Sequence, residues 1–229
     1  GSAAAYYAAH AGQTVTLLEQ FEFLHEKGSS HGESRIFRLA YPSDQYTKLC
    51  INALSLWHDA EELSGMNVLK MTGGLDFGRK DNVSMKQVRD ALTAFEIPFE
   101  VHDNESLALK FPGLSLPSDT TALYNSQAGV LNATKSVRMF QYLARYYGAN
   151  LIDGCKVLDV KHVTKDGEQL VEVKTNRDSI VCRKCIVTAG AWTKKLLMSC
   201  EASQNTSIPL KPIQTFVAYW KCESPELFD

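Results

Sequence analysis

The residues best suited to chemistry lie in one short stretch, GSSHGESRIFR, which spans residues 28–38. Arg35 and Arg38 are three positions apart, and on a helix this spacing would place both cations on one face. His31 and several glycines and serines come directly before them. Backbone N–H groups, a histidine and two fixed cations can surround one planar or anionic ligand. The stretch therefore predicts a binding site for such a ligand.

Arginines on a helix face are often only solvated, so the neighbours of Arg35 and Arg38 matter. Most of these neighbours are apolar or small, and they include Ile36, Phe37, Leu39, Ala40, Tyr41 and Pro42. An arginine in such a run is expected to be partly buried and paired with an anion. We therefore favour an anion-binding role over a solvated surface.

The start of the chain reads as the second half of a dinucleotide-binding βαβ unit. Residues 2–11 are rich in alanine and favour a helix, and residues 14–18 are a short β-branched and apolar run that predicts a buried strand. In such a unit an acidic residue about 20 positions after the glycines bonds a ribose hydroxyl. If Gly1 is the last of those glycines, Glu19 stands at the right distance. Any helix–strand unit can end in glutamate, so only the stretch that follows it favours this interpretation.

Composition places the chain among ordinary globular proteins, with 229 residues, 45% of them hydrophobic and 22% charged. A formal net charge of -2 gives no electrostatic reason to expect nucleic acid or an acidic membrane as a partner. No apolar run approaches the roughly 18 residues of a membrane span, and no basic leader opens the chain. Six cysteines in a chain of this length favour a reduced, intracellular compartment over a disulfide framework.

Helices and strands alternate at both ends of the chain, around a mixed insert. We predict helices at residues 44–63, 84–95, 105–111, 134–147 and 193–200. We predict strands at residues 66–77, 121–124, 129–131, 150–152, 156–162, 170–175, 179–182 and 184–189. The first of these helices carries an apolar stripe that we expect to pack on the core, made of Leu49, Ala53, Leu56, Trp57, Ala60 and Leu63.

This alternation indicates two interleaved domains. The first would consist of residues 1–70 and 132–208, and the second, mainly antiparallel, of residues 71–131 and 209–229. Residues 15–18 and 186–188 would be parallel strands in one sheet of the first domain.

Cys182 and Cys185 form an isolated CxxC pair. A zinc site would need a second such pair or paired histidines, and a thioredoxin-like site would need a helix N-terminus directly after it. Cysteines three apart on a strand point to opposite faces of the sheet. We therefore predict no metal site and no redox role for this pair.

A set of stretches spread over the whole chain carries a family resemblance. They read GSAAAYYAA, LLEQFEFLHEKGSSHGESRIFR, AYPSDQY, TGGLDFG, FPGLSLP, GVLNATKSVRMFQ and IVTAGAWTKKLL, followed by PLKP. In these stretches the chain resembles the monomeric sarcosine oxidase family of FAD-dependent amine oxidases, which includes N-methyltryptophan oxidase and the peroxisomal sarcosine and pipecolate oxidases. The resemblance implies an α/β fold. In it, a Rossmann-like FAD-binding domain is interleaved with a mixed, mainly antiparallel substrate domain, as in glutathione reductase and D-amino-acid oxidase.

The resemblance also assigns roles to individual residues. The catalytic residues would be His31, Arg35, Arg38 and Tyr41. The FAD-binding residues would be Gly1, Glu19, Gln20, Ser29, Ser30, Arg35, Val157, Gly190 and Trp192. Arg38 would hold the substrate carboxylate, and Glu19 would bond the adenosine ribose. For two of these residues a structural role is an alternative to cofactor binding. Val157 could be an ordinary core valine, and Gly190 could belong to a simple β–α turn.

The implied reaction is oxidation of a secondary amine, such as an N-methyl amino acid, to an imine, with O₂ reduced to H₂O₂. The family is monomeric, intracellular, and peroxisomal or cytoplasmic. In the family, the flavin-linking cysteine belongs to the C-terminal half, which this chain lacks. The chain also lacks the first strand of the FAD-binding domain. We therefore expect the chain alone neither to bind FAD tightly nor to catalyse turnover. A glycine or D-amino-acid oxidase, an FAD dehydrogenase and a non-catalytic fragment remain alternatives. A nicotinamide dehydrogenase is less expected, because that class has no functional reason to carry the stretch at residues 28–38.

Overall fold

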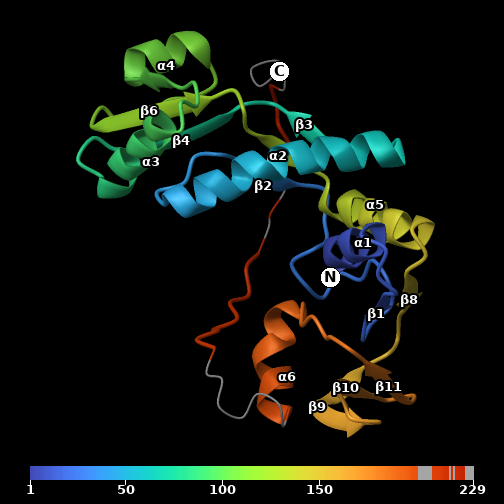
Figure 1. The fold of residues 1–229 in the computed structure, drawn as a ribbon. Coiled ribbons are helices and arrows are strands. Elements are labelled where there is room, and N and C mark those ends of the chain that lie inside the picture. The colour runs from blue at the N-terminus through green and yellow to red at the C-terminus, as the bar shows by residue number, and fades with distance from the viewer. Residues whose placement is uncertain (201–207, 217, 219, 225–229) are drawn as a thin grey trace. The chain divides into compact units, whose positions relative to one another are not determined.

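The computed structural model describes residues 1–200, 208–216, 218 and 220–224. The chain divides into two compact units, and Figure 1 gives the order of their elements. Unit 1 consists of Gly1–Glu33 and Ala133–Thr215, and unit 2 consists of Ser34–Asn132 and Phe216–Asp229.

Unit 1 contains a parallel pair of short strands, each preceded by a helix. β1 (Thr16–Leu18) pairs with β8 (Asn150–Ile152). α1 (Ser2–His10) precedes β1, and α5 (Ala133–Tyr146) precedes β8. Parallel strands cannot be joined by a tight turn, and here the chain between β1 and β8 passes through Ser34–Asn132 of unit 2 and then α5.

α1 and α5 lie side by side, the blue and yellow helices of Figure 1. Tyr6 of α1 is almost fully buried, and its ring centroid lies 5.9 Å from that of Phe140 in α5. Ala5 and Ala9 are buried beside it. Small residues on one helix thus leave room for the aromatic residues, and this pairing forms the helical core of unit 1.

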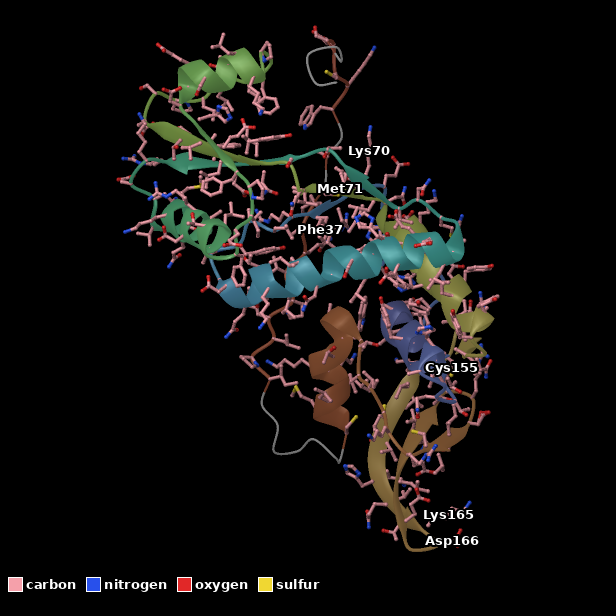
Figure 2. The ribbon with its side chains drawn as sticks, turned by 45° about the horizontal axis from the view of Figure 1, so that its top comes forward. Phe37, Lys70, Met71, Cys155, Lys165 and Asp166 are labelled. Atoms are coloured by element: carbon pink, nitrogen blue, oxygen red, sulfur yellow. The ribbon has the colours of Figure 1, made fainter. Side chains whose placement is uncertain are left out.

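Unit 1 also contains an antiparallel sheet, with a short helix packed against one of its strands. Its strands, in the order β11-β10-β9, are β9 (Val157–Lys165), β10 (Glu168–Thr175) and β11 (Ser179–Cys182). Lys165 and Asp166, labelled in Figure 2, mark the turn between β9 and β10. After η1 (Gly190–Trp192), α6 (Thr193–Ser199) packs on β9, next to a buried cluster of Val160, Val173 and Cys200.

The strand predicted at residues 184–189 is wrong, because these residues form no β-ladder. Ile186 is 67% exposed, so this apolar run is not buried as a sheet strand would be. The partner of β1 is β8 instead. Thr188 nevertheless lies close to the start of α1: a Cβ at Gly1 would be 3.3 Å from Thr188 Oγ1 and 3.7 Å from Leu17 Cδ1. An apolar run indicates burial, but only ladder hydrogen bonds make a strand.

Unit 2 contains two three-stranded antiparallel sheets, ordered β2-β7-β3 and β4-β6-β5. Their strands are β2 (Arg35–Phe37), β3 (Leu69–Met71), β4 (Gly74–Arg79), β5 (Glu100–His102), β6 (Thr120–Asn125) and β7 (Gly129–Leu131). The pairing of β2 with β7 places the first unit boundary after Glu33, whereas the sequence analysis placed it after residue 70. The assignment of FAD binding and substrate binding to separate domains stays a prediction.

The described residues of unit 2 also form the helices α2 (Asp44–Ser64), α3 (Val83–Ala94) and α4 (Asn104–Lys110). Asn82 caps α3, its side chain accepting from Ser84 N–H at 2.8 Å, and Asp103 forms a capping box with Ser106.

The apolar stripe of α2 is only partly buried. Ala60 is fully buried, but Leu49, Leu56 and Leu63 are exposed in the structure. The prediction that these leucines pack on the core is therefore wrong. Helical periodicity identifies an apolar face, but it does not identify the surface that covers that face.

Gly129 allows the three strands of its sheet to approach closely. A Cβ at this position would collide with the carbonyl group of Lys70 and lie 3.0 Å from Met71 Cα. Phe37 and Met71, both paired with Gly129, are labelled with Lys70 in Figure 2. A side chain at this position would therefore have to displace backbone atoms of β3.

We expect Gly129→Ala to lower the free energy of unfolding by about 1–3 kcal/mol, because a methyl group that meets backbone cannot be relieved by a rotamer change. Urea denaturation measures this difference. Gly28→Ala is the matched control, since its Cβ would only touch His25 at 3.6 Å and Trp192 at 3.9 Å; we expect a change within about 0.5 kcal/mol. An unchanged urea midpoint for Gly129→Ala would show that β3 does not need this glycine.

Candidate functional site

Glu19 lies directly after β1, at the end of a strand, as the sequence predicts. Its backbone N–H donates to Ile152 O at 2.9 Å, and its carbonyl accepts from Cys155 N–H at 2.8 Å. Its Oε1 accepts from Phe21 N–H at 3.0 Å and lies 3.5 Å from His25 Nε2. The end of the parallel strand pair therefore holds a carboxylate in a fixed position.

The first turn of α1 has the features of an anion-binding helix terminus. α1 starts directly after Gly1; no described side chain caps it, and its first turn holds no acidic residue. Backbone N–H groups at such a terminus attract phosphate. A side chain at Gly1 would approach the Thr188 hydroxyl, since its Cβ would lie 3.3 Å from Oγ1. A helix terminus for the phosphates and Glu19 for a ribose hydroxyl fit a dinucleotide such as FAD.

An aromatic cluster occupies the loop that follows Glu19. The ring of Phe21 stands edge-on to Trp192 at 5.4 Å and to His25 at 4.8 Å, between centroids. The ammonium group of Lys27 lies 4.3 Å from the centre of the Phe21 ring. The structure thus brings Trp192, a predicted cofactor residue, to the loop after β1. The contributions of Phe21, His25 and Lys27 are not predicted from the sequence.

The segment around His31 is tied to the start of α5. Gly32 N–H donates to Thr134 Oγ1 at 2.9 Å, and Thr134 N–H donates to Gly32 O at 3.1 Å. Gly32 has a φ of 98°, a conformation that favours glycine. Ser29 and Ser30 are exposed, and His31 is half-buried. These two reciprocal hydrogen bonds fix the backbone next to His31.

Arg35 and Arg38 do not share a helix face, because the segment is a strand. Ile36 and Phe37 are β-branched and aromatic, and they pair with β7. Arg35 lies within β2, where its Nη1 donates to Ser34 O at 2.7 Å. Arg38 follows the strand. The helical alternative for their spacing is therefore wrong.

Arg38 belongs to a small polar cluster within unit 2. Its Nη1 donates to Asp76 Oδ1 at 2.8 Å, and its Cζ lies 4.9 Å from the centre of the Tyr41 ring. The side chain of Arg38 is 40% exposed and that of Asp76 is 24% exposed. The structure therefore brings together Arg38 and Tyr41, two predicted site residues, and adds a carboxylate that the sequence analysis missed.

Partial burial shapes the acid–base properties of this cluster. Burial raises the pKa of Asp76, while the charge and hydrogen bond of Arg38 oppose that rise. Burial likewise raises the pKa of the Cys50 thiol on α2, against the charge of Arg38 and a hydrogen bond with Tyr41. The cluster thus combines a cation, a carboxylate, a phenol and a thiol.

The remaining predicted cofactor residues occupy ordinary positions. Val157 starts β9 and packs against the buried cluster of Val160, Val173 and Cys200. Gly190 opens η1 with a φ of 52°, and Gln20 is half-buried directly after Glu19. Contacts of Val157, Gly190 and Gln20 with a cofactor stay predictions.

The cysteines are free thiols. Burial raises the pKa of Cys182, Cys185 and Cys200, which lowers the fraction of the reactive thiolate. Among the described residues, no group of three or more His, Cys, Asp and Glu side chains could hold a metal ion. No helix in the described part of the chain combines the length and apolarity needed to cross a membrane.

Curated relatives agree with the resemblance seen in the sequence. The chain is 37% identical over 222 residues to a probable sarcosine oxidase from Arabidopsis thaliana, an alignment that covers 96% of the chain and 53% of the relative. It is 33% identical over 221 residues to the peroxisomal sarcosine oxidase of Homo sapiens, covering 96% and 54%. The chain thus spans about half the length of the curated relatives it matches.

Solved structures confirm the predicted α/β fold class. NikD, an unusual amino acid oxidase essential for nikkomycin biosynthesis, has a TM-score of 0.75 at 24% identity, over 86% of this chain and 50% of NikD. L-Proline dehydrogenase from P. horikoshii has a TM-score of 0.76 at 23% identity, over 91% of this chain and 54% of the dehydrogenase.

A model of the DAO family, described as FAD dependent oxidoreductase, matches residues 1–227. With nearly its whole length matched, the chain belongs to the FAD-dependent oxidoreductase family.

Proposed function

We propose that the whole protein catalyses the FAD-dependent oxidation of a secondary amine that carries a carboxylate, such as sarcosine or pipecolate, to an imine. The observation that carries this proposal is the partly exposed guanidinium of Arg38, held by Asp76 and Tyr41. A fixed guanidinium suits a carboxylate ligand. The relatives named as sarcosine oxidases support the choice of an N-methyl amino acid.

When bound, FAD would supply the two-electron oxidation of the amine to the imine, with O₂ reduced to H₂O₂. The start of α1 at Gly1 would hold the phosphates, and Glu19 would bond the adenosine ribose. The other proposed FAD contacts are Gln20, Ser29, Ser30, Arg35, Val157, Gly190 and Trp192.

Arg38 would bind the substrate carboxylate through two parallel N–H···O bonds. A carboxylate held at two points fixes the position of the amine, and that positioning lowers the barrier to reaction. Tyr41 would form part of the substrate pocket. His31 and Arg35 would lie next to the cofactor and supply polar contacts there.

We further propose that the flavin is attached through a cysteine outside these 229 residues and that the protein acts as a monomer, in the peroxisome or the cytoplasm. The bacterial relative from Bacillus sp. (strain NS-129), 29% identical, is named a monomeric sarcosine oxidase. The human and mouse relatives are named peroxisomal sarcosine oxidases. These names support the proposal.

The test is to purify the whole protein, record its flavin absorbance, and measure H₂O₂ formation and dye reduction separately. We expect a flavin band, and H₂O₂ formation with sarcosine or pipecolate above that with glycine or D-alanine. A preference for glycine or D-alanine would identify a glycine or D-amino-acid oxidase instead. Dye reduction without H₂O₂ would identify a dehydrogenase, and a protein without flavin would indicate a non-catalytic role.

A further inference from the structure

The proposed mechanism leaves one carboxylate of the Arg38 cluster without a role. Asp76 lies on β4, where it pairs with Leu123 of β6. The β4–β6 ladder runs without a register shift from Gly74↔Asn125 to Arg79↔Thr120, so ladder pairs before and after Asp76 along β4 hold its backbone in place. Only 24% of its side chain is exposed. A half-buried carboxylate on a paired strand is a rigid anchor for whatever it binds.

Two contacts restrain the guanidinium of Arg38 from different directions. Asp76 Oδ1 accepts from Nη1 at 2.8 Å, and the ring of Tyr41 lies 4.9 Å from Cζ. A guanidinium has five N–H donors. Among the residues that the structure describes, Asp76 is the sole hydrogen-bond partner of this group. The contacts with Asp76 and Tyr41 therefore leave N–H donors of the guanidinium for the carboxylate of a bound ligand.

We propose that Asp76 is a positioning residue that sets, through Arg38, how tightly the enzyme binds the carboxylate of its substrate. This inference rests on the proposed function. An arginine on a flexible stem loses rotamer freedom when it binds a ligand. Asp76 has already removed much of that freedom, so the substrate gains the two-point contact with less entropic loss.

The role requires a hydrogen-bond acceptor at Asp76 rather than a negative charge. A second carboxylate on the same cation would be repelled by the charge of Asp76, so the charge itself does not favour substrate binding. The surroundings do not favour the charge either, since burial raises the pKa of Asp76. An asparagine, whose amide oxygen can still accept from Nη1, should therefore preserve the function, and an alanine should not.

The experiment compares wild type, Asp76→Ala and Asp76→Asn in the whole enzyme, with sarcosine and sarcosinamide, in which an uncharged amide replaces the carboxylate, as substrates. We expect Asp76→Ala to raise KM for sarcosine about tenfold, roughly the scale of an arginine's rotamer entropy. We expect kcat for sarcosine to change less than about twofold, because sarcosine, once bound to Asp76→Ala, still makes both contacts with Arg38. Both constants for sarcosinamide should also change less than about twofold, because sarcosinamide has no carboxylate for Arg38 to bind. Asp76→Asn should stay within about twofold of wild type for both substrates.

Asp81→Ala is the matched control, because Asp81 pairs with Arg79 on the exposed surface of the same unit; all constants should stay as in wild type. If Asp76→Ala does not fold, Asp76→Ser replaces it, since a serine is too short to hold Nη1. Equal losses with both substrates would make Asp76 merely structural and overturn the inference. A lower KM for sarcosine in Asp76→Ala would mean that Asp76 competes with the substrate, and this too would overturn it.

A binding measurement separates this inference from the proposed reaction. Methoxyacetate has the shape of sarcosine with an ether oxygen in place of the amine, so it can bind without being oxidised. By calorimetry, Asp76→Ala should weaken its binding about tenfold while Asp76→Asn should not. If this pattern of binding holds but the wild type oxidises no secondary amine, the proposed function is wrong and the inference about Asp76 stands. Absence of methoxyacetate binding to wild type would overturn the inference.

Discussion

Arg38→Lys is expected to lower kcat/KM for an N-methyl amino acid by on the order of 10²-fold or more, about 3 kcal/mol of transition-state stabilisation. A lysine ammonium is a compact point charge and cannot present two parallel N–H donors to a carboxylate. In this structure it would also have to replace a guanidinium that contacts both Asp76 and Tyr41. Steady-state kinetics of the whole enzyme with sarcosine measure the loss.

Two comparisons test whether this loss of kcat/KM comes from the contact between Arg38 and the substrate carboxylate. Sarcosinamide, which lacks the charge, should lose much less kcat/KM on the same substitution. Arg79→Lys is the matched control, because Arg79 is an exposed arginine of unit 2 that pairs with Asp81; it should behave as wild type. If both substrates lose equally in Arg38→Lys, the role of Arg38 is structural or directed at the cofactor.

Glu19→Ala is expected to weaken FAD binding by about 1.5–3 kcal/mol, the usual loss when a charged hydrogen-bond partner is removed. There are two reasons. We propose that Glu19, directly after β1, bonds the ribose hydroxyl. Its Oε1 also accepts from Phe21 N–H and lies 3.5 Å from His25 Nε2, so its loss loosens the loop that carries the aromatic cluster. Titration of the apoprotein with FAD, before any covalent attachment, measures the change.

Glu26→Ala is the control for this substitution, because Glu26 is an exposed glutamate of the same loop. It should leave FAD affinity unchanged. Glu19→Gln keeps an oxygen that can accept a hydrogen bond and should lose less than Glu19→Ala. Equal FAD affinity in wild type and Glu19→Ala would remove Glu19 from the cofactor site.

Elements with strong periodicity or clear end signals follow from the sequence alone. The helix predicted at residues 134–147 is α5 (Ala133–Tyr146), because an apolar stripe and Gly148 mark its face and its end. β7, β8 and β11 have the predicted bounds. Glu19 follows β1 as predicted, since a short β-branched run before an acidic residue is a local signal.

Several misses depend on contacts between residues that are far apart in the sequence. Asp76 stands among apolar residues of a strand, and nothing near it in the sequence shows that it pairs with Arg38, 38 positions away. The ring contact of Phe21 with Trp192 likewise joins two residues that lie far apart in the sequence. Residues 184–189 have the composition of a strand but lack a ladder partner. Local patterns set propensity, and tertiary pairing overrides it.

We propose that Arg38 directs a carboxylate-bearing amine to FAD-dependent oxidation, and the decisive experiment is flavin reduction in the absence of O₂. In rapid mixing, sarcosine should bleach the flavin absorbance of the whole wild-type protein, and Arg38→Lys should bleach on the order of 10²-fold more slowly at a low, equal sarcosine concentration. Sarcosinamide should bleach both proteins at similar rates. A wild-type flavin that stays oxidised with sarcosine and pipecolate, or equal bleaching of both proteins by sarcosine, would contradict the claim.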